Sequence, residues 1–199
     1  MHEYSLSYHD RKNIYYFVVI LSGIISIPIT LFVGSISSIL NLSLMAPSGL
    51  VIFFLVFHLF DKYIWKLPFM YSLGIIKIPN LNGRWLATIK SSKSNNDIEA
   101  RVTITQTYSK IKILLTTEQS RSESTMANID IIDPNSFKLR YEYHAEFQKD
   151  ENSEIKRHYG VTSLFLESEN QEFDNNHKAS YYTELNRSSL GTMYFARSK

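Results

Sequence analysis

The sequence lacks cysteine altogether, and over one long stretch it also lacks charge. Without thiols the chain has no disulfide framework, no thiol nucleophile and no thiolate metal site. Acidic and basic residues are absent from residues 14–59, although 20% of the chain is charged. The sequence therefore divides into an apolar first third, suited to lipid, and a polar remainder, suited to water.

Catalytic and cofactor motifs are also absent. The sequence contains no Gly-rich phosphate loop, no G-x-S-x-G turn and no His pair at metal-ligand spacing. Carboxylates are scattered over polar turns and alternating positions, a pattern typical of a solvated surface. The sequence thus predicts a protein that is not an enzyme, with no catalytic residue, no metal site and no cofactor.

The polar part of the chain is electrically balanced. From residue 80 onward, basic and acidic residues are equal in number. Proteins that bind the backbone of DNA or RNA need an excess of Lys and Arg. We therefore expect no DNA or RNA polymer as a partner.

Two apolar runs fill the first third of the chain. Residues 14–33 are uncharged and, at about 1.5 Å per residue, are long enough to cross the roughly 30 Å hydrocarbon core of a bilayer. Residues 42–60 form a second run after a short connection that contains Gly and Ser. We expect two antiparallel transmembrane helices. A cleavable signal peptide is the alternative for the first run, which is long for one.

The charges that flank these runs predict their orientation. Arg11 and Lys12 precede the first run, Lys62 and Lys66 follow the second, and the connection carries no charge. Because Lys and Arg concentrate on the cytoplasmic side of membrane helices, both termini are expected in the cytoplasm. Neither run contains Asp, Glu, Lys or Arg, so a pore would have to come from assembly of several copies.

Beyond residue 80 the apolar residues recur with a period of two, which is typical of β-strands. Polar turns separate eight such segments without an intervening helical pattern, so we expect consecutive antiparallel strands. Eight strands of this length can close into an up-and-down β-barrel of lipocalin-like form that holds one small ligand. The predicted strands are 83–91, 98–108, 110–118, 122–132, 136–146, 158–168, 178–185 and 191–198.

The predicted fold class is therefore a membrane-anchored all-β protein with an N-terminal pair of transmembrane helices. Residues 1–66 form the predicted two-helix region, residues 67–79 a connector, and residues 80–199 the eight-stranded barrel.

Strand alternation identifies side chains that should face the barrel interior. In residues 136–146, Phe137, Leu139, Tyr141 and Tyr143 share one face, and Trp85 has the inward parity of the first strand. Hydroxyl groups buried there need partners, since an unpaired buried polar group costs about 1–3 kcal/mol. A pocket lined by Tyr, Trp and hydroxyl groups suits a planar polar ligand such as a nucleobase. The alternative is that the rings fill the barrel and hydrogen-bond to one another.

Four motifs, taken with the two apolar runs, give the chain a family resemblance. They are LNGRW at 81–85, SRSESTMANI at 120–129, LRYEY at 139–143 and ASYYTELNRSSLGTMYFAR at 179–197. Their order resembles the two-transmembrane, β-strand-rich (SMODS-associating) effectors that accompany cGAS-like nucleotidyltransferases in the bacterial anti-phage system CBASS. The resemblance covers nearly the whole chain. Ala179 stands where the family pattern often has glycine, whereas Tyr181, Thr183 and Arg187 match it.

This resemblance implies a multi-pass sensor of the bacterial inner membrane. A cyclic oligonucleotide second messenger, expected to be a cyclic dinucleotide, would bind the cytosolic barrel and drive homo-oligomerisation. Disruption of the inner membrane would then cause abortive infection. The expected nucleotide-binding residues are Trp85, Tyr141 and Tyr143 for stacking, Ser124, Thr125 and Thr162 as hydroxyl donors, and Tyr181 and Arg187 in the closing hairpin; Arg101 and Arg140 are expected to be solvated.

Two other functions fit the same architecture. The barrel could be a membrane-tethered, lipocalin-like binder of a lipid or other hydrophobic ligand, which would need a more uniformly apolar interior than residues 136–146 offer. It could also be a protein-interaction module for which the helices serve as an anchor. Stabilisation of the protein by a cyclic dinucleotide, by a fatty acid or by neither separates the three.

Overall fold

The structure, a computed structural model, describes residues 1–7, 11–41, 43–147, 157–169, 172–173, 176–185 and 188–198. The chain divides into two compact units, one made by Asp10–Ile76 and the other by Met1–His9 together with Lys77–Lys199. The first unit is helical and the second consists of strands. The N-terminal residues thus belong to the β unit, although helices follow them in the sequence.

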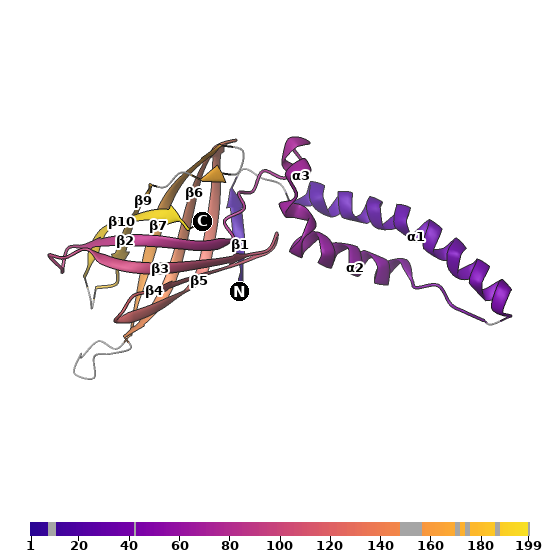
Figure 1. Cartoon of the computed structure of the whole chain (residues 1–199), viewed down its shortest axis with the longest axis horizontal. Helices are drawn as coiled ribbons and strands as arrows, with labels where there is room; N and C mark the ends of the chain where they lie inside the picture. The colour runs from indigo at the N-terminus through magenta and orange to yellow at the C-terminus, as the bar shows by residue number, and fades with distance from the viewer. Residues whose placement is uncertain are drawn as a thin grey trace. The chain divides into compact units, whose positions relative to one another are not determined.

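The helical unit contains, among its described residues, α1 (Lys12–Leu40), α2 (Gly49–Lys62), the 3₁₀ helix η1 (Ile64–Lys66) and α3 (Pro68–Ser72). α1 and α2 run side by side (Figure 1), and the rings of Tyr15 and Phe57 are 5.9 Å apart. Of the helices described, α1 is the one long and apolar enough to cross a membrane, and most of its side chains are exposed. This helix contains the first predicted span, residues 14–33.

A second spanning helix is not shown. The predicted span of residues 42–60 is helical only from Gly49, so α2 has 14 residues and is about 21 Å long. A helix normally needs about 20 residues to cross the hydrocarbon core. The helix begins late because Pro47 disfavours helical backbone at the residue before it and because Ser48 caps α2, its Oγ accepting the Val51 N–H at 3.4 Å. The multi-pass topology therefore remains a prediction.

The β unit is a single sheet with ten strands among the described residues. They are β1 (His2–Ser7), β2 (Gly83–Ser91), β3 (Ile98–Gln106), β4 (Lys110–Thr116), β5 (Ser120–Asp133), β6 (Ser136–Phe147), β7 (Arg157–Glu169), β8 (Glu172–Phe173), β9 (His177–Thr183) and β10 (Leu190–Arg197). All eight predicted strands are present, and they correspond in order to β2 to β7, β9 and β10. β1 and β8 were not predicted.

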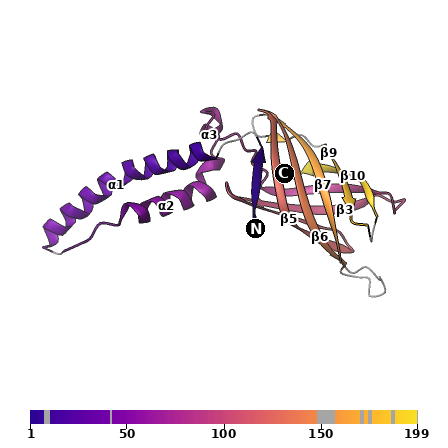
Figure 2. The same cartoon turned by 180° about the vertical axis from the view of Figure 1, so that it is seen from behind.

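The strand pairings form a closed circuit. β2 to β7 pair consecutively, β7 pairs with β9, β9 with β10, and β10 pairs back with β2, all antiparallel. Figures 1 and 2 show these strands side by side from opposite directions. The predicted alternation is confirmed at Phe137, Leu139, Tyr141 and Tyr143, which are all buried. The core of the unit therefore lies inside the circuit, where these apolar faces leave water.

β1 fills a gap between β4 and β5. These two strands pair with each other only over Leu114–Thr116 and Arg121–Glu123, because a bulge between Ser124 and Met126 turns β5 away from β4. Beyond the bulge β1 pairs antiparallel with β4 and, over Tyr4–Ser7, parallel with β5. The N-terminus of the chain thus completes the sheet.

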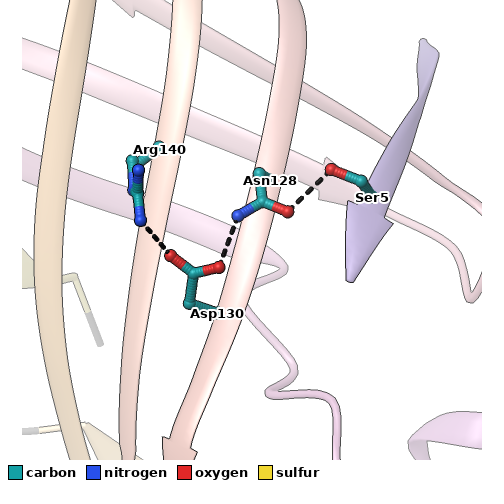
Figure 3. Close-up of polar contacts among 4 residues, drawn as sticks. All are labelled: Ser5, Asn128, Asp130 and Arg140. Atoms are coloured by element: carbon teal, nitrogen blue, oxygen red, sulfur yellow. Dashed lines mark hydrogen bonds and ion pairs between the residues drawn. The ribbon is translucent and has the colours of Figure 1, made fainter. Parts of the chain in front are cut away.

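Polar side chains fasten β1 to the outer surface of β5 and β6 (Figure 3). Ser5 Oγ donates to Asn128 Oδ1 at 2.6 Å, and Asn128 Nδ2 donates to Asp130 Oδ1 at 2.6 Å. Arg140 Nη2 completes the chain with a 2.6 Å contact to Asp130 Oδ2. Hydrogen bonds from Ser7, Asn128 and Arg140 hold the pKa of the Asp130 carboxyl below its ordinary value. Arg140 is thus a surface residue, as predicted, but it is paired with Asp130.

Gln106 joins the two segments of the β unit that lead to the helices. Its buried side chain accepts the Leu81 N–H at 2.8 Å and donates to the Pro79 carbonyl at 3.2 Å and to Tyr4 Oη at 3.5 Å. Tyr4 Oη in turn donates to the Tyr108 carbonyl at 2.8 Å. One glutamine therefore links β1, which precedes the helical unit, to residues 79–81, which follow it.

Candidate ligand-binding site

The β unit encloses a cavity of about 560 Å³, within the usual size range of small-molecule sites. It lies toward one end of the strands: Ile89 and Ser91 of β2 line it, but Trp85 of the same strand does not. The exposed turn residues Asn96 and Glu118 also line it, so this end, called the mouth below, is open to solvent. The cavity is thus a cup with one closed end.

A row of hydroxyl groups crosses one wall of the cup. Tyr141 of β6 and Tyr181 of β9 are both cross-strand partners of Thr162 on the intervening β7. Cross-strand partners point to the same face of a sheet, so all three side chains enter the cavity. All three are at most 7% exposed. The row can offer hydrogen bonds to a polar ligand from three adjacent strands.

Two glycines make room for the tyrosine rings. Gly160 is the cross-strand partner of Tyr143, and a Cβ there would lie 2.5 Å from Tyr143 Cζ. Gly191 is the partner of Tyr181, and a Cβ there would lie 2.8 Å from Tyr181 Cε1. Real Cβ atoms do not approach other atoms so closely, so larger residues would displace the rings. The positions of both rings on the cavity wall depend on these glycines.

Burial keeps the central tyrosine neutral. Loss of water raises the pKa of Tyr141 to about 12, and a hydrogen bond with Thr162 offsets part of this increase. At physiological pH the phenol is therefore protonated and available as a donor. A ligand that presents acceptor oxygens, such as ribose hydroxyls or phosphate, would suit this wall.

Charge is distributed unevenly around the mouth. Asp97 and Glu99 line it beside the start of β3, and Glu118 lines it from the β4–β5 turn. Among the described lining residues there is no Lys or Arg, and His158 of β7 is the one whose side chain can become cationic. In an eight-strand circuit β3 and β7 lie opposite each other. The carboxylates and the imidazole therefore occupy opposing walls.

Four of the eight predicted site residues come together in this cavity. Tyr141, Tyr143, Thr162 and Tyr181 all line it, carried by the three neighbouring strands β6, β7 and β9. Sequence parity was sufficient to place the two tyrosines of β6 on the inner face. Their grouping with Thr162 and Tyr181 depends on strand register.

Trp85 is buried, as its parity predicted, but at the closed end of the cup. Its indole N–H donates to the Leu81 carbonyl at 3.1 Å. Its ring centroid is 5.6 Å from that of Phe173, and the Arg197 guanidinium lies 5.5 Å from it. Trp85 therefore closes the interior and does not line the cavity.

Ser124 and Thr125 also lie outside the cavity lining, and Thr125 is the extra residue of the β5 bulge. Ser124 Oγ accepts the Ile113 N–H at 2.9 Å and lies 2.8 Å from His2 Nε2, so it joins β4, β5 and β1. Thr125 is exposed. Arg187 falls outside the described residues, and Arg101 is exposed as predicted.

Sequence reasoning missed several lining residues. His158 was not among the predicted site residues, and His144 of the same hairpin faces the outer surface beside Tyr159. The inward direction of His158 follows from Thr162, because residues four apart on a strand share a face. The pair formed by Thr183 and Ser189 was also missed: Ser189 N donates to Thr183 Oγ1 at 2.9 Å, and Ser189 Oγ lies 3.1 Å from Ser91 Oγ. These contacts depend on loop geometry, which alternation does not encode.

Comparison with known proteins leads to one family. Residues 76–197, more than half of the chain, match the family described as "Cap15, cyclic dinucleotide receptor domain". The "CD-NTase-associated protein 15" of Yersinia aleksiciae is 27% identical over 139 residues, which cover 69% of this chain and 64% of that protein. The match thus spans less than two thirds of the relative's length. It confirms the family to which the resemblance assigned the chain, and the whole cavity lies inside the matched region.

Proposed function

Because the chain belongs to the Cap15 cyclic dinucleotide receptor family, we propose that it is a CBASS anti-phage effector whose β unit binds a cyclic dinucleotide. The cavity of about 560 Å³ with its row of hydroxyl groups carries the proposal. The closed circuit of strands acts as a lipocalin-like, up-and-down barrel around the ligand. The protein is a receptor and performs no catalysis in this proposal.

The cavity wall suits both parts of such a ligand. The bases can stack on the rings of Tyr143 and Tyr181, which the two glycines hold against the wall. The hydroxyls of Tyr141 and Thr162 can donate to the ribose and phosphate oxygens. A bound ligand would replace water as partner of these buried groups. A long-chain lipid is the poorer match, because hydroxyl and carboxylate groups make up much of this wall.

Chain topology supports two membrane crossings. β1 precedes α1, yet it pairs with strands that follow α3, so the chain must cross a membrane an even number of times between Ser7 and Gly83. α1 supplies one crossing. α2 supplies the other, with residues 43–48, which carry no regular secondary structure, leading into it. The inner membrane is the proposed location, with both termini and the β unit in the cytoplasm.

Effector action requires that the ligand favour an assembled state. A ligand shifts such an equilibrium only through its higher affinity for one of the states. We place homo-oligomerisation of the β units upstream of membrane disruption, and membrane disruption upstream of abortive infection. The exposed apolar surface of α1 is available for packing against other copies.

Ligand titration of the full-length chain in nanodiscs tests this function. A panel of cyclic dinucleotides containing adenine, guanine and uracil, with a fatty acid for comparison, is screened by thermal shift and calorimetry. At least one cyclic dinucleotide is expected to bind and to release dye from vesicles that contain the protein. Stabilisation by the fatty acid alone would favour the lipid-binding alternative, and no response to any ligand would favour the protein-interaction alternative.

A pair of adjacent tyrosines supplies a matched control. Tyr181→Phe removes a hydroxyl from the cavity, whereas Tyr182→Phe removes one from the outer surface, where Tyr182 is 60% exposed. Loss of one hydrogen bond of about 0.5–1.5 kcal/mol weakens binding by roughly 3- to 10-fold. We expect this loss for Tyr181→Phe only. Equal effects of the two substitutions would place the ligand elsewhere.

A further inference from the structure

The two sides of the mouth differ in the charge that they can carry. Asp97, Glu99 and Glu118 lie on the side of β3 and the β4–β5 turn, where the Asp97 carboxylate is 3.7 Å from Lys90 Nζ and Glu99 has the outward parity of its partner Thr88. His158 of β7 occupies the opposite side and, among the described lining residues, is the one whose side chain can be cationic. An anionic ligand is repelled by the first side and attracted by the second.

His158 is held rigidly at this position. Its side chain is 6% exposed, and its ring meets that of Tyr143 edge-on with centroids 6.2 Å apart. The Phe147 ring lies on the mouth side of it, with centroids 5.7 Å apart. β7 places the imidazole four residues from Thr162, on the same face and nearer the mouth. His158 therefore lies between the row of hydroxyl groups and the mouth, on the same face of the sheet.

We propose that protonated His158 binds a phosphodiester of the cyclic dinucleotide and so orients the ligand with its phosphates toward the β6–β7–β9 wall. This inference rests on the proposed function and specifies the regulation of the same site by pH. The bases, stacked on Tyr143 and Tyr181, then direct their edges toward the mouth, where the Glu118 carboxylate can accept hydrogen bonds from base N–H groups.

Binding is then coupled to uptake of a proton. The rings of Tyr143 and Phe147 pack against the imidazole, with centroids 6.2 Å and 5.7 Å from it. A phosphodiester keeps its negative charge throughout the neutral pH range. When it arrives, the charged imidazole gains a charge-assisted hydrogen bond, which is stronger than a neutral one. Affinity is therefore expected to rise as the pH falls.

Among the described residues that line the cavity, no other class of titratable group titrates in the same range as an imidazole. Carboxylates as a class titrate near pH 4 and phenols near pH 10, whereas imidazoles titrate between about pH 5 and 8. A change in affinity between pH 5.5 and 8.5 therefore reports the imidazole. The titratable groups that face it across the cavity are Tyr141 and Tyr143 of β6, Tyr181 of β9, and the carboxylates of Asp97, Glu99 and Glu118.

The test is a calorimetric titration of the full-length protein in nanodiscs with cyclic di-AMP, cyclic di-GMP, cyclic di-UMP and cyclic GMP–AMP between pH 5.5 and 8.5. For those that bind, the expected Kd increases by up to about tenfold per pH unit toward the alkaline end. Repeating the titration in buffers of different ionisation enthalpy measures the protons taken up, without any substitution. Net uptake approaching one proton per site is expected.

His158→Gln retains hydrogen bonding but removes the charge, and His144→Gln is its matched control. His144 lies on the outer surface of the same hairpin, where its ring is 5.0 Å from that of Tyr159. We expect His158→Gln to weaken binding about tenfold at pH 6 and to abolish the pH dependence, and His144→Gln to change neither.

Wild-type binding without pH dependence or proton uptake would overturn the role of His158 and leave the proposed function intact. An unchanged pH dependence in the His158→Gln protein would do the same. If none of the four nucleotides binds at any pH, the proposed function and this inference both fail.

Discussion

At the scale of single residues, the site depends on small side chains as much as on the groups that would touch a ligand. Tyr143 and Tyr181 have their positions because Gly160 and Gly191 stand opposite them. A cavity lined by aromatic rings needs such gaps, since rings of this size cannot lie against a neighbouring Cβ. The glycines therefore shape the wall without contributing a functional group.

Gly160→Ala is expected to destabilise the β unit by about 1–3 kcal/mol, as overpacked core substitutions do. The added methyl group would lie 2.5 Å from Tyr143 Cζ and 2.8 Å from the Tyr182 carbonyl oxygen. Chemical denaturation of the purified chain measures the loss. Adding Tyr143→Leu removes the ring and should reduce the penalty, whereas Gly23→Ala, in the interior of α1 with open space around it, should not lower stability. An undiminished penalty in the double variant would show that the backbone contact dominates.

Tyr141 should make the protein sensitive to alkali. Its folded-state pKa of about 12 exceeds the ordinary value of 10.0, so the folded state disfavours the ionised phenol. The stabilisation is fully present below pH 10 and is lost as the pH rises from about 10 to 12. Melting temperatures measured across this interval should fall more steeply for wild type than for Tyr141→Phe. Parallel curves would show that this phenol ionises equally well in both states.

At the scale of secondary structure, alternation of apolar residues was enough to identify the eight strands of the circuit. It could not identify β1, in which only Tyr4 is buried and whose partners lie more than a hundred residues away in the sequence. Alternation also predicts which face of the sheet a side chain lies on, but not where the side chain lies between the closed end and the mouth. Trp85 is inward as predicted, yet it lies below the cavity.

The sequence-based predictions also failed at positions where the backbone is irregular. The bulge in β5 inserts Thr125 as an extra, exposed residue, whereas Ser124 keeps the inward parity of its partner Tyr143 but is held by Ile113 and His2 and does not line the cavity. In the helical unit, composition alone extended the second apolar run through Pro47, whereas the helix starts after it. Both differences arise where the backbone departs from regular strand or helix geometry.

A disulfide can test the position of β1, because the chain contains no other cysteine. Ser5 and Asn128 are cross-strand partners, and Ser5 Oγ lies 2.6 Å from Asn128 Oδ1. Ser5→Cys with Asn128→Cys is expected to form an intrachain bond on mild oxidation. Closure of so long a loop should stabilise the protein by on the order of 4 kcal/mol.

Non-reducing electrophoresis and denaturation with and without reductant measure these effects. Ser5→Cys with Thr103→Cys is the control, since Thr103 pairs with Arg84 and Leu114 and not with β1. A product linked only between chains would indicate that β1 inserts into the sheet of another copy.

At the scale of the whole molecule, the pairing of β1 constrains membrane topology. In the proposed topology the two ends of the helical unit emerge on one side of the membrane, because both continue into the same sheet. The basic residues on both flanks of the predicted hairpin agree with this requirement: Arg11 and Lys12 precede it, and Lys62 and Lys66 follow it. One spanning helix alone would separate β1 from its partners.

Single cysteines in this cysteine-free chain test the arrangement. Met45→Cys, in the connection between α1 and α2, should react in intact spheroplasts with a maleimide that cannot cross membranes. Ser92→Cys, in the β2–β3 turn, should react only after the membrane is permeabilised. Labelling of both positions in intact spheroplasts would contradict the double crossing.

The pairing of β1 with β5 also determines when the sheet can be completed during translation. The six residues of β1 are synthesised before α1 and α2, whereas the strand β5 beside them is complete only when Asp133 has been added. At translation rates of about 5–20 residues per second, this delay is on the order of 6–25 s. In the proposed topology α1 and α2 can enter the bilayer during this time, before β1 pairs with β5.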